Sequence, residues 1–170
     1  MSPLPTPLPD AEAQCRQLAE LIRPLLAERL ALVGIHSGGV WIAERLKELL
    51  GLGEEIGHID VSFFRDDYAA KGLHPQVRPT VIPFEVEGRH LILVDDVLYT
   101  GRTTRAAINE LFDYGRPAKI ELAVLADRGG RELPIAAQYC VWKTEPLAGA
   151  ENLVLARDTE NRLVWSLEHV

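Results

Sequence analysis

Short apolar runs alternate with longer segments in which apolar residues recur every three or four positions. Each apolar run is bounded by polar or turn-forming residues and predicts a buried strand, at residues 30–35, 91–94 and 120–126. The spaced pattern predicts amphipathic helices at residues 10–29, 40–50 and 103–114. Strands that alternate with helices are typical of an α/β fold, in which a mainly parallel twisted sheet is covered by helices on both faces.

The first two predicted helices carry local signals. Asp10 can cap the first helix, and Pro24 is expected to kink it or to split it in two. The expected buried faces contain Leu18, Leu21, Ile22, Leu25 and Leu26 in the first helix and Ile42, Leu46, Leu49 and Leu50 in the second.

The segments around the central strands are less regular. Residues 56–64 predict a strand whose hydrophobicity Asp60 interrupts. Residues 65–79 are polar and long for a connection inside a domain, which is typical of a functional or mobile loop. Short strands are expected near residues 138–142, 153–156 and 163–167, and this last part of the chain would form a small hood.

Composition limits the class of protein. The length of 170 residues suits one domain, expected over residues 10–170 after a flexible proline-rich arm over residues 1–9. The net charge of −7 gives the chain as a whole no attraction to nucleic acid or to an anionic membrane. Cys15 and Cys140 stand far apart and indicate neither a zinc site nor a disulfide framework. With no basic leader and no membrane-length apolar run, the sequence predicts a cytoplasmic protein without a membrane partner.

The stretch over residues 91–104 carries the most specific chemistry. Its apolar run leads into Asp95 and Asp96, and a turn of small residues then opens a predicted helix. Threonine hydroxyls and backbone N–H groups at a helix N-terminus bind phosphate. Neighbouring carboxylates can accept hydrogen bonds from vicinal sugar hydroxyls or hold magnesium through water. A phosphate site beside a diol site describes a ribose 5-phosphate, whereas the simpler alternative is that the acids only cap the helix.

Other polar segments are expected to lie at the same edge of the sheet. Ligands of parallel sheets collect at the carboxyl ends of the strands. Segments that follow predicted strands are residues 36–39, 95–104 and 127–131. Their convergence favours a binding site over simple helix capping.

Several segments together resemble one known family. The matching segments are residues 32–35, 59–67, 94–103, 115–117, 122–129 and 131–135. They resemble the PyrR family, whose members are pyrimidine operon regulators and also uracil phosphoribosyltransferases of the type I fold. The resemblance implies a reaction in which uracil displaces pyrophosphate from phosphoribosyl pyrophosphate (PRPP), with Mg²⁺, to give UMP. It also implies a homo-oligomer.

The resemblance assigns roles to residues of this chain. Asp95 and Asp96 would hold the ribose hydroxyls and magnesium, and with Tyr99 they are the candidate catalytic residues. The 5-phosphate would be bound by Thr100, Gly101, Arg102, Thr103 and Thr104. The pyrophosphate loop would be His36, Ser37, Gly38 and Gly39, and residues 65–79, including Arg65 and Asp66, would form a flexible lid. The base pocket would include Asp127 and Arg128, for which a structural ion pair is the alternative, as simple packing is for Tyr99.

The chain departs from the family at three places, one of which is the tail after Tyr139, where it has Cys140-Val141-Trp142-Lys143. Where the family has Lys-Thr-Arg-Gly, this chain has His36-Ser37-Gly38-Gly39, which lacks a fixed positive charge. A segment that binds a pyr leader messenger RNA in the family has lost a histidine and its final arginine here, while Arg131 remains as a candidate RNA contact. Two alternatives therefore stay open: a UMP-sensing RNA-binding regulator with weak catalysis, and a phosphoribosyltransferase for another base.

Overall fold

The structure, a computed structural model, describes residues 4–62, 78–145, 147 and 150–169. The lid candidates Arg65 and Asp66 lie outside the described residues. The elements are α1 (Ala11–Ile22), η1 (Arg23–Leu25), β1 (Leu30–Ile35), α2 (Gly38–Leu50), β2 (Gly57–Ile59), β3 (His90–Leu98), α3 (Arg102–Leu111), η4 (Phe112–Tyr114), β4 (Lys119–Asp127), β5 (Tyr139–Lys143), β6 (Glu151–Arg157) and β7 (Leu163–His169).

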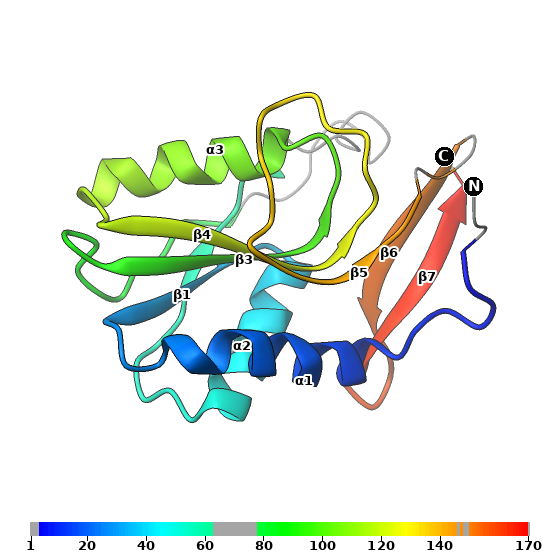
Figure 1. The fold of residues 1–170 in the computed structure, drawn as a ribbon, viewed down its shortest axis with the longest axis horizontal. Coiled ribbons are helices and arrows are strands. Elements are labelled where there is room, and N and C mark those ends of the chain that lie inside the picture. The colour runs from blue at the N-terminus through cyan, green and yellow to red at the C-terminus, as the bar shows by residue number, and fades with distance from the viewer. Residues whose placement is uncertain (1–3, 63–77, 146, 148–149, 170) are drawn as a thin grey trace.

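A five-stranded sheet in the order β2-β1-β3-β4-β5 forms the centre of the molecule, and all of its paired strands are parallel. Helices α1 and α2 cover one face and α3 covers the other (Figure 1). This arrangement confirms the predicted α/β fold.

The alternation of side chains along β3 builds both halves of the core. Ile92 and Val94 pack with residues of α1 and α2, whereas Leu91 and Leu93 pack with residues of α3. Residues of both sets are almost fully buried, which explains why this strand reads as a continuous apolar run.

The predicted first helix is split in two. It ends at Ile22, and the one-turn segment η1 contains Pro24, in agreement with the prediction that proline breaks it. Two leucines that were expected to face the core do not: Leu21 is 46% exposed and Leu49 is 37% exposed. Each lies at the border of a narrower apolar stripe, because the sheet covers only one side of each helix.

Strand β3 is longer than the predicted strand 91–94. It continues to Leu98, because Asp95 still pairs with Val124 of β4 and Val97 with Ala126. The two acids therefore belong to the strand and do not follow it. In the segment predicted as strand 56–64, β2 ends at Ile59, and Asp60 accepts the backbone N–H of Ser62 instead of continuing the ladder.

The last two strands, β6 and β7, form an antiparallel ribbon beside the sheet, and this ribbon is called the hood below (Figure 1). Nε1 of Trp165 donates to Gln14 at 2.7 Å, and the backbone N–H of Leu163 donates to Glu12 at 2.8 Å, so β7 is tied to α1. Within the N-terminal arm, Leu8 is half-buried against the same core. Among the described residues, no helix is both long and apolar enough to cross a membrane.

Candidate active site

The three segments expected at the carboxyl edge of the sheet follow β1, lie at the end of β3 and follow β4. Because β1, β3 and β4 are adjacent and parallel, the three segments are neighbours. The structure therefore brings the sequence-predicted segments together.

The turn between β3 and α3 is built as an anion cradle. Gly101 adopts a left-handed conformation (φ 94°) as the N-terminal cap of α3, and as a glycine it has no side chain that could cap the helix. N–H groups in the first turn of a helix have no partner inside the helix. The carbonyl oxygen of Thr100 accepts the N–H groups of Glu132 and Leu133 at 2.9 and 3.2 Å, which fixes the turn to the loop after β4. This geometry suits the phosphate role predicted for the turn.

The threonines and the arginine of this turn differ in exposure. Thr100 and Thr104 are 4% and 2% exposed, and Thr103 is half-buried. The hydroxyl of Thr100 accepts the backbone N–H of Arg102 at 3.2 Å. The exposed guanidinium of Arg102 forms an ion pair with Glu132 at 2.6 Å, which ties it to the same loop.

The two acids of β3 lie on different faces of the strand. A Cβ atom on Gly38 of α2 would lie 2.8 Å from Cγ of Asp96, so Asp96 points toward α2. Neighbouring side chains of a strand alternate, so Asp95 points toward the face that α3 covers. Asp95 is 8% exposed, and its Oδ1 accepts the backbone N–H of Asp96 at 2.9 Å. The carboxylates thus flank the end of β3.

The turn after β1 lies directly beside this acid pair. Gly38 and Gly39 begin α2, and both are buried. A Cβ atom on Gly39 would lie 3.1 Å from Cα of Asp95, so a larger residue cannot be placed there without moving β3. The side chain of Ser37, which precedes the helix, does not cap it. Glycine thus permits the close approach of α2 to the strand that carries the acids.

Arg78, which lies within the predicted lid segment 65–79 but was not named individually, contacts this turn. Nη1 of Arg78 donates to Oγ of Ser37 at 2.9 Å and lies 3.4 Å from Nδ1 of His36. Burial, Arg78 and the neighbouring ring of His58 lower the pKa of His36 below 6.5, against an opposing effect of Asp60. His36 is therefore neutral at pH 7.

Asp60 anchors the backbone of Arg78. Its Oδ2 accepts the N–H of Arg78 at 2.7 Å, and its Oδ1 accepts the N–H of Ser62 at 3.0 Å. Burial raises the pKa of Asp60, but these hydrogen bonds outweigh it and the net pKa is lowered. The interruption that Asp60 makes in an apolar run was the sequence signal for this anchor.

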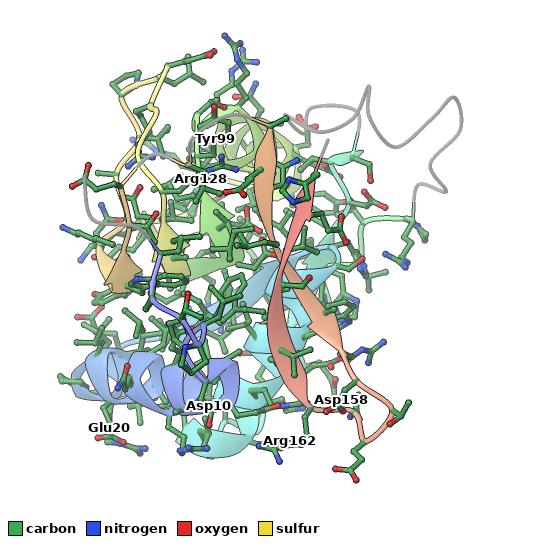
Figure 2. All side chains as sticks on the ribbon, turned by 90° about the vertical axis from the view of Figure 1, so that its right-hand side faces the viewer. Asp10, Glu20, Tyr99, Arg128, Asp158 and Arg162 are labelled. Carbon is green, nitrogen blue, oxygen red and sulfur yellow. The ribbon has the colours of Figure 1, made fainter. Side chains whose placement is uncertain are left out.

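The proposed base pocket contains a stack of two side chains. The guanidinium of Arg128 lies 4.2 Å from the centre of the Tyr99 ring, and Figure 2 shows both side chains where the ends of β3 and β4 approach β6. A Cβ atom on Gly130 would lie 3.0 Å from Cδ2 of Tyr99, so the loop after β4 also packs on this ring. Arg128 donates to Oδ1 of Asn152 at 3.2 Å. Asn152 of β6, which sequence analysis missed, thereby joins the hood to the site.

Asp127 forms an ion pair with Arg131, whereas the alternative given by the sequence paired it with Arg128. Nη2 of Arg131 lies 2.7 Å from Oδ2 of Asp127. Arg131 also donates to the carbonyl oxygens of Tyr99 at 2.5 Å and Ile135 at 2.8 Å. Its guanidinium thus holds the β4 loop to the phosphate turn.

The acid pair suits a magnesium ion that arrives with its substrate. The described part of the chain contains no group of three or more His, Cys, Asp or Glu side chains arranged as a metal site. Magnesium is often held by one or two carboxylates together with phosphate oxygens and water. Asp95 and Asp96 are the residues that fit this role, directly or through water.

The fold and this carboxyl edge define a phosphoribosyltransferase. The family model for the phosphoribosyl transferase domain matches residues 7–151. A purine phosphoribosyltransferase from Pyrococcus horikoshii superposes with a TM-score of 0.59 at 27% identity, over 79% of this chain and 82% of that one. A hypoxanthine phosphoribosyl transferase from Trypanosoma cruzi superposes with a TM-score of 0.61 at 23% identity, over 79% of this chain and 73% of that one, which shows the fold alone.

Curated relatives narrow the family. "Bifunctional protein PyrR" of Ralstonia nicotianae is 56% identical over 155 residues, which cover 89% of this chain and 88% of that protein. The protein of the same name in Pseudomonas paraeruginosa is 50% identical over 161 residues, covering 92% and 89%. The chain belongs to the PyrR family of phosphoribosyltransferases, as its sequence motifs indicated.

Proposed function

We propose that this chain transfers ribose 5-phosphate from PRPP to uracil, with release of pyrophosphate and formation of UMP. The observation that carries the proposal is the contact of three elements at one edge of the sheet: the turn before α3, the acid pair of β3 and the turn before α2. They offer, in order, an anion cradle, acceptors for sugar hydroxyls and a second turn for the leaving group. PRPP has the three matching chemical groups: a 5-phosphate, the hydroxyls of its ribose and a pyrophosphate.

The reaction breaks the bond from C1 of the ribose to pyrophosphate and forms a bond from C1 to N1 of uracil, which loses its proton. Positive charge develops on the ribose ring as the polyanion departs, so the carboxylates of Asp95 and Asp96 are placed to stabilise the ring. The N–H groups at the start of α3 would hold the 5-phosphate and fix the orientation of the sugar. Magnesium, when bound with PRPP, neutralises part of the charge of the leaving group.

The uracil base would bind between β3, the loop after β4 and the hood. The Arg128–Tyr99 stack and the hydrogen bond from Arg128 to Asn152 give the proposed base pocket a fixed wall. Tyr99 stands at the position where purine-using relatives have an acid, which favours uracil over a purine.

Formation of UMP from uracil, PRPP and Mg²⁺ tests the proposal, with hypoxanthine, guanine and orotate as competing bases. We expect nucleotide formation with uracil only. Nucleotide formation with another base and not with uracil would overturn the assignment of the base.

A second activity, regulation of pyr gene expression through binding of a leader RNA, is supported by membership in a family of bifunctional proteins. UMP would be the signal in this role. A gel-shift titration with the organism's own pyr leader RNA, with and without UMP, tests it. No UMP-dependent shift would exclude it. A homo-oligomeric state and a cytoplasmic location belong to the same proposal and rest on the family resemblance.

A further inference from the structure

Arg78 is held against the turn that precedes α2. Its backbone N–H is bound by the buried carboxylate of Asp60 at 2.7 Å, and its Nη1 donates to Ser37 at 2.9 Å. The backbone of the residue is thus anchored, while its side chain is exposed. Both side-chain contacts, to Ser37 and to His36, use the same nitrogen of a guanidinium that has five N–H donors.

This turn also lies beside the acid pair. Gly38, which follows Ser37 directly, packs on the carboxylate of Asp96. A group that bridges Arg78 and the acids at this turn would therefore meet positive charge on one side and negative charge on the other. The pyrophosphate of a bound PRPP, joined to a ribose whose hydroxyls face the acids, is such a group.

A leaving pyrophosphate carries several negative charges and needs positive charge nearby. His36 does not supply it at neutral pH, since burial and its neighbours keep it uncharged. Of the arginine and lysine side chains that the structure describes, Arg78 is the one with a hydrogen bond to this turn. Arginine suits the task, because its planar fork can bind two phosphate oxygens at once.

We propose that Arg78 supplies the positive charge that binds the pyrophosphate group of PRPP at the turn before α2 and stabilises it as the leaving group. This inference rests on the proposed function and deepens it. The loss of the family's basic residues from His36-Ser37-Gly38-Gly39 is then compensated by a residue 41 positions after Ser37 in the chain. The two glycines at the turn let it pack against β3, which keeps the bound pyrophosphate close to the acids.

Pyrophosphate binding, measured by calorimetry with magnesium and without uracil, tests this role in the full chain. The variants are Arg78→Gln, which can keep a hydrogen bond to Ser37 but has no charge, and Arg78→Lys, which keeps the charge. Arg162→Gln, an exposed arginine in the turn between β6 and β7, is the matched control. Figure 2 places Arg162 at the end of the ribbon that lies away from Tyr99 and Arg128.

We expect Arg78→Gln to weaken pyrophosphate binding at least about tenfold, Arg78→Lys to weaken it less, and Arg162→Gln to leave it unchanged. In UMP synthesis, Arg78→Gln should raise the KM for PRPP and lower kcat, with little change in the KM for uracil. Circular dichroism of each variant checks that it is folded.

If a folded Arg78→Gln variant bound pyrophosphate as tightly as the wild type, the role of Arg78 would be overturned. The proposed function would not be affected. Wild-type protein that binds pyrophosphate but makes no UMP would overturn the proposed function and leave Arg78 as an anion-binding residue. Wild-type protein that does not bind pyrophosphate would overturn both.

Discussion

Gly38 of α2 and Asp96 of β3 are in direct contact: a Cβ atom on Gly38 would lie 2.8 Å from Cγ of Asp96. The turn that precedes α2 and the acid pair therefore cannot move independently. A side chain at position 38 would have to displace either the carboxylate or the start of the helix.

Gly38→Ala should consequently reduce UMP synthesis while leaving the protein folded. A shift of a reacting group by about 1 Å can lower the rate about 100-fold. The control is Gly53→Ala, because a Cβ atom there would meet nothing within 4 Å. Steady-state kinetics with melting curves for both variants measures the effect. Equal activity of Gly38→Ala and Gly53→Ala would show that the Gly38–Asp96 contact does not matter for catalysis.

Thr103→Val should weaken binding of PRPP. Thr103 is half-buried in the first turn of α3, where its hydroxyl can donate to a 5-phosphate oxygen. Loss of one hydrogen bond to a charged group costs about 1–3 kcal/mol, or roughly 5- to 150-fold in Kd. Calorimetric titration with PRPP and magnesium gives the Kd, and Thr159→Val, in the exposed turn after β6, serves as control. Unchanged affinity would remove Thr103 from the phosphate site.

Arg131→Gln should destabilise the fold. Arg131 joins Asp127, Tyr99 and Ile135 through hydrogen bonds of 2.5–2.8 Å, and its side chain is only 25% exposed. Loss of these bonds leaves carbonyl and carboxylate oxygens without their donor and should cost about 2–4 kcal/mol in free energy of unfolding.

Urea denaturation compares this variant with Arg23→Gln. The ion pair of Arg23 with Glu20 is exposed on both sides, so its loss should cost no more than about 1 kcal/mol. If both variants lost equally little stability, Arg131 would have no structural role and would be free for another, such as RNA binding.

The pKa of His36 should be below 6.5 in the folded protein, mainly because the ring is partly buried and secondly because Arg78 lies next to it. Protonation therefore opposes folding. The stability that neutral His36 contributes is complete above the unfolded pKa of about 6.5 and declines as the pH falls from that value toward the folded pKa.

Proton NMR titration of the His36 ring measures this pKa directly. Arg78→Gln should move it upward toward 6.5, and Arg162→Gln should not change it. A wild-type value at or above 6.5 would mean that His36 adds positive charge to the turn near neutral pH, which contradicts the neutral histidine described above.

Most of the central sheet could be predicted from the sequence, because buried parallel strands such as β1 and β4 are continuous apolar runs. The end of the first helix could also be predicted, because Pro24 cannot continue a helix. The far end of β3 could not. Asp95 and Asp96 look like residues beyond a strand, and only pairing with β4 keeps them within it. The exposure of Leu21 and Leu49 likewise depends on how much of each helix the sheet covers.

The candidate site likewise has parts that the sequence could predict and parts that it could not. The phosphate turn and the acid pair are continuous in sequence, so their chemistry could be predicted from local residues. The contact of Arg78 with Ser37 spans 41 residues, and the contact of Arg128 with Asn152 depends on the packing of the hood. Local patterns do not encode such contacts.

The most direct test of the account is UMP synthesis by the Asp95→Asn/Asp96→Asn double variant beside the wild type. The two amides keep the size of the side chains but remove both negative charges at the end of β3. With uracil, PRPP and Mg²⁺, we expect UMP from the wild type and a loss of activity of at least about 100-fold in a double variant that remains folded. UMP synthesis by the folded double variant at a rate near that of the wild type would contradict the assignment of these acids to the active site.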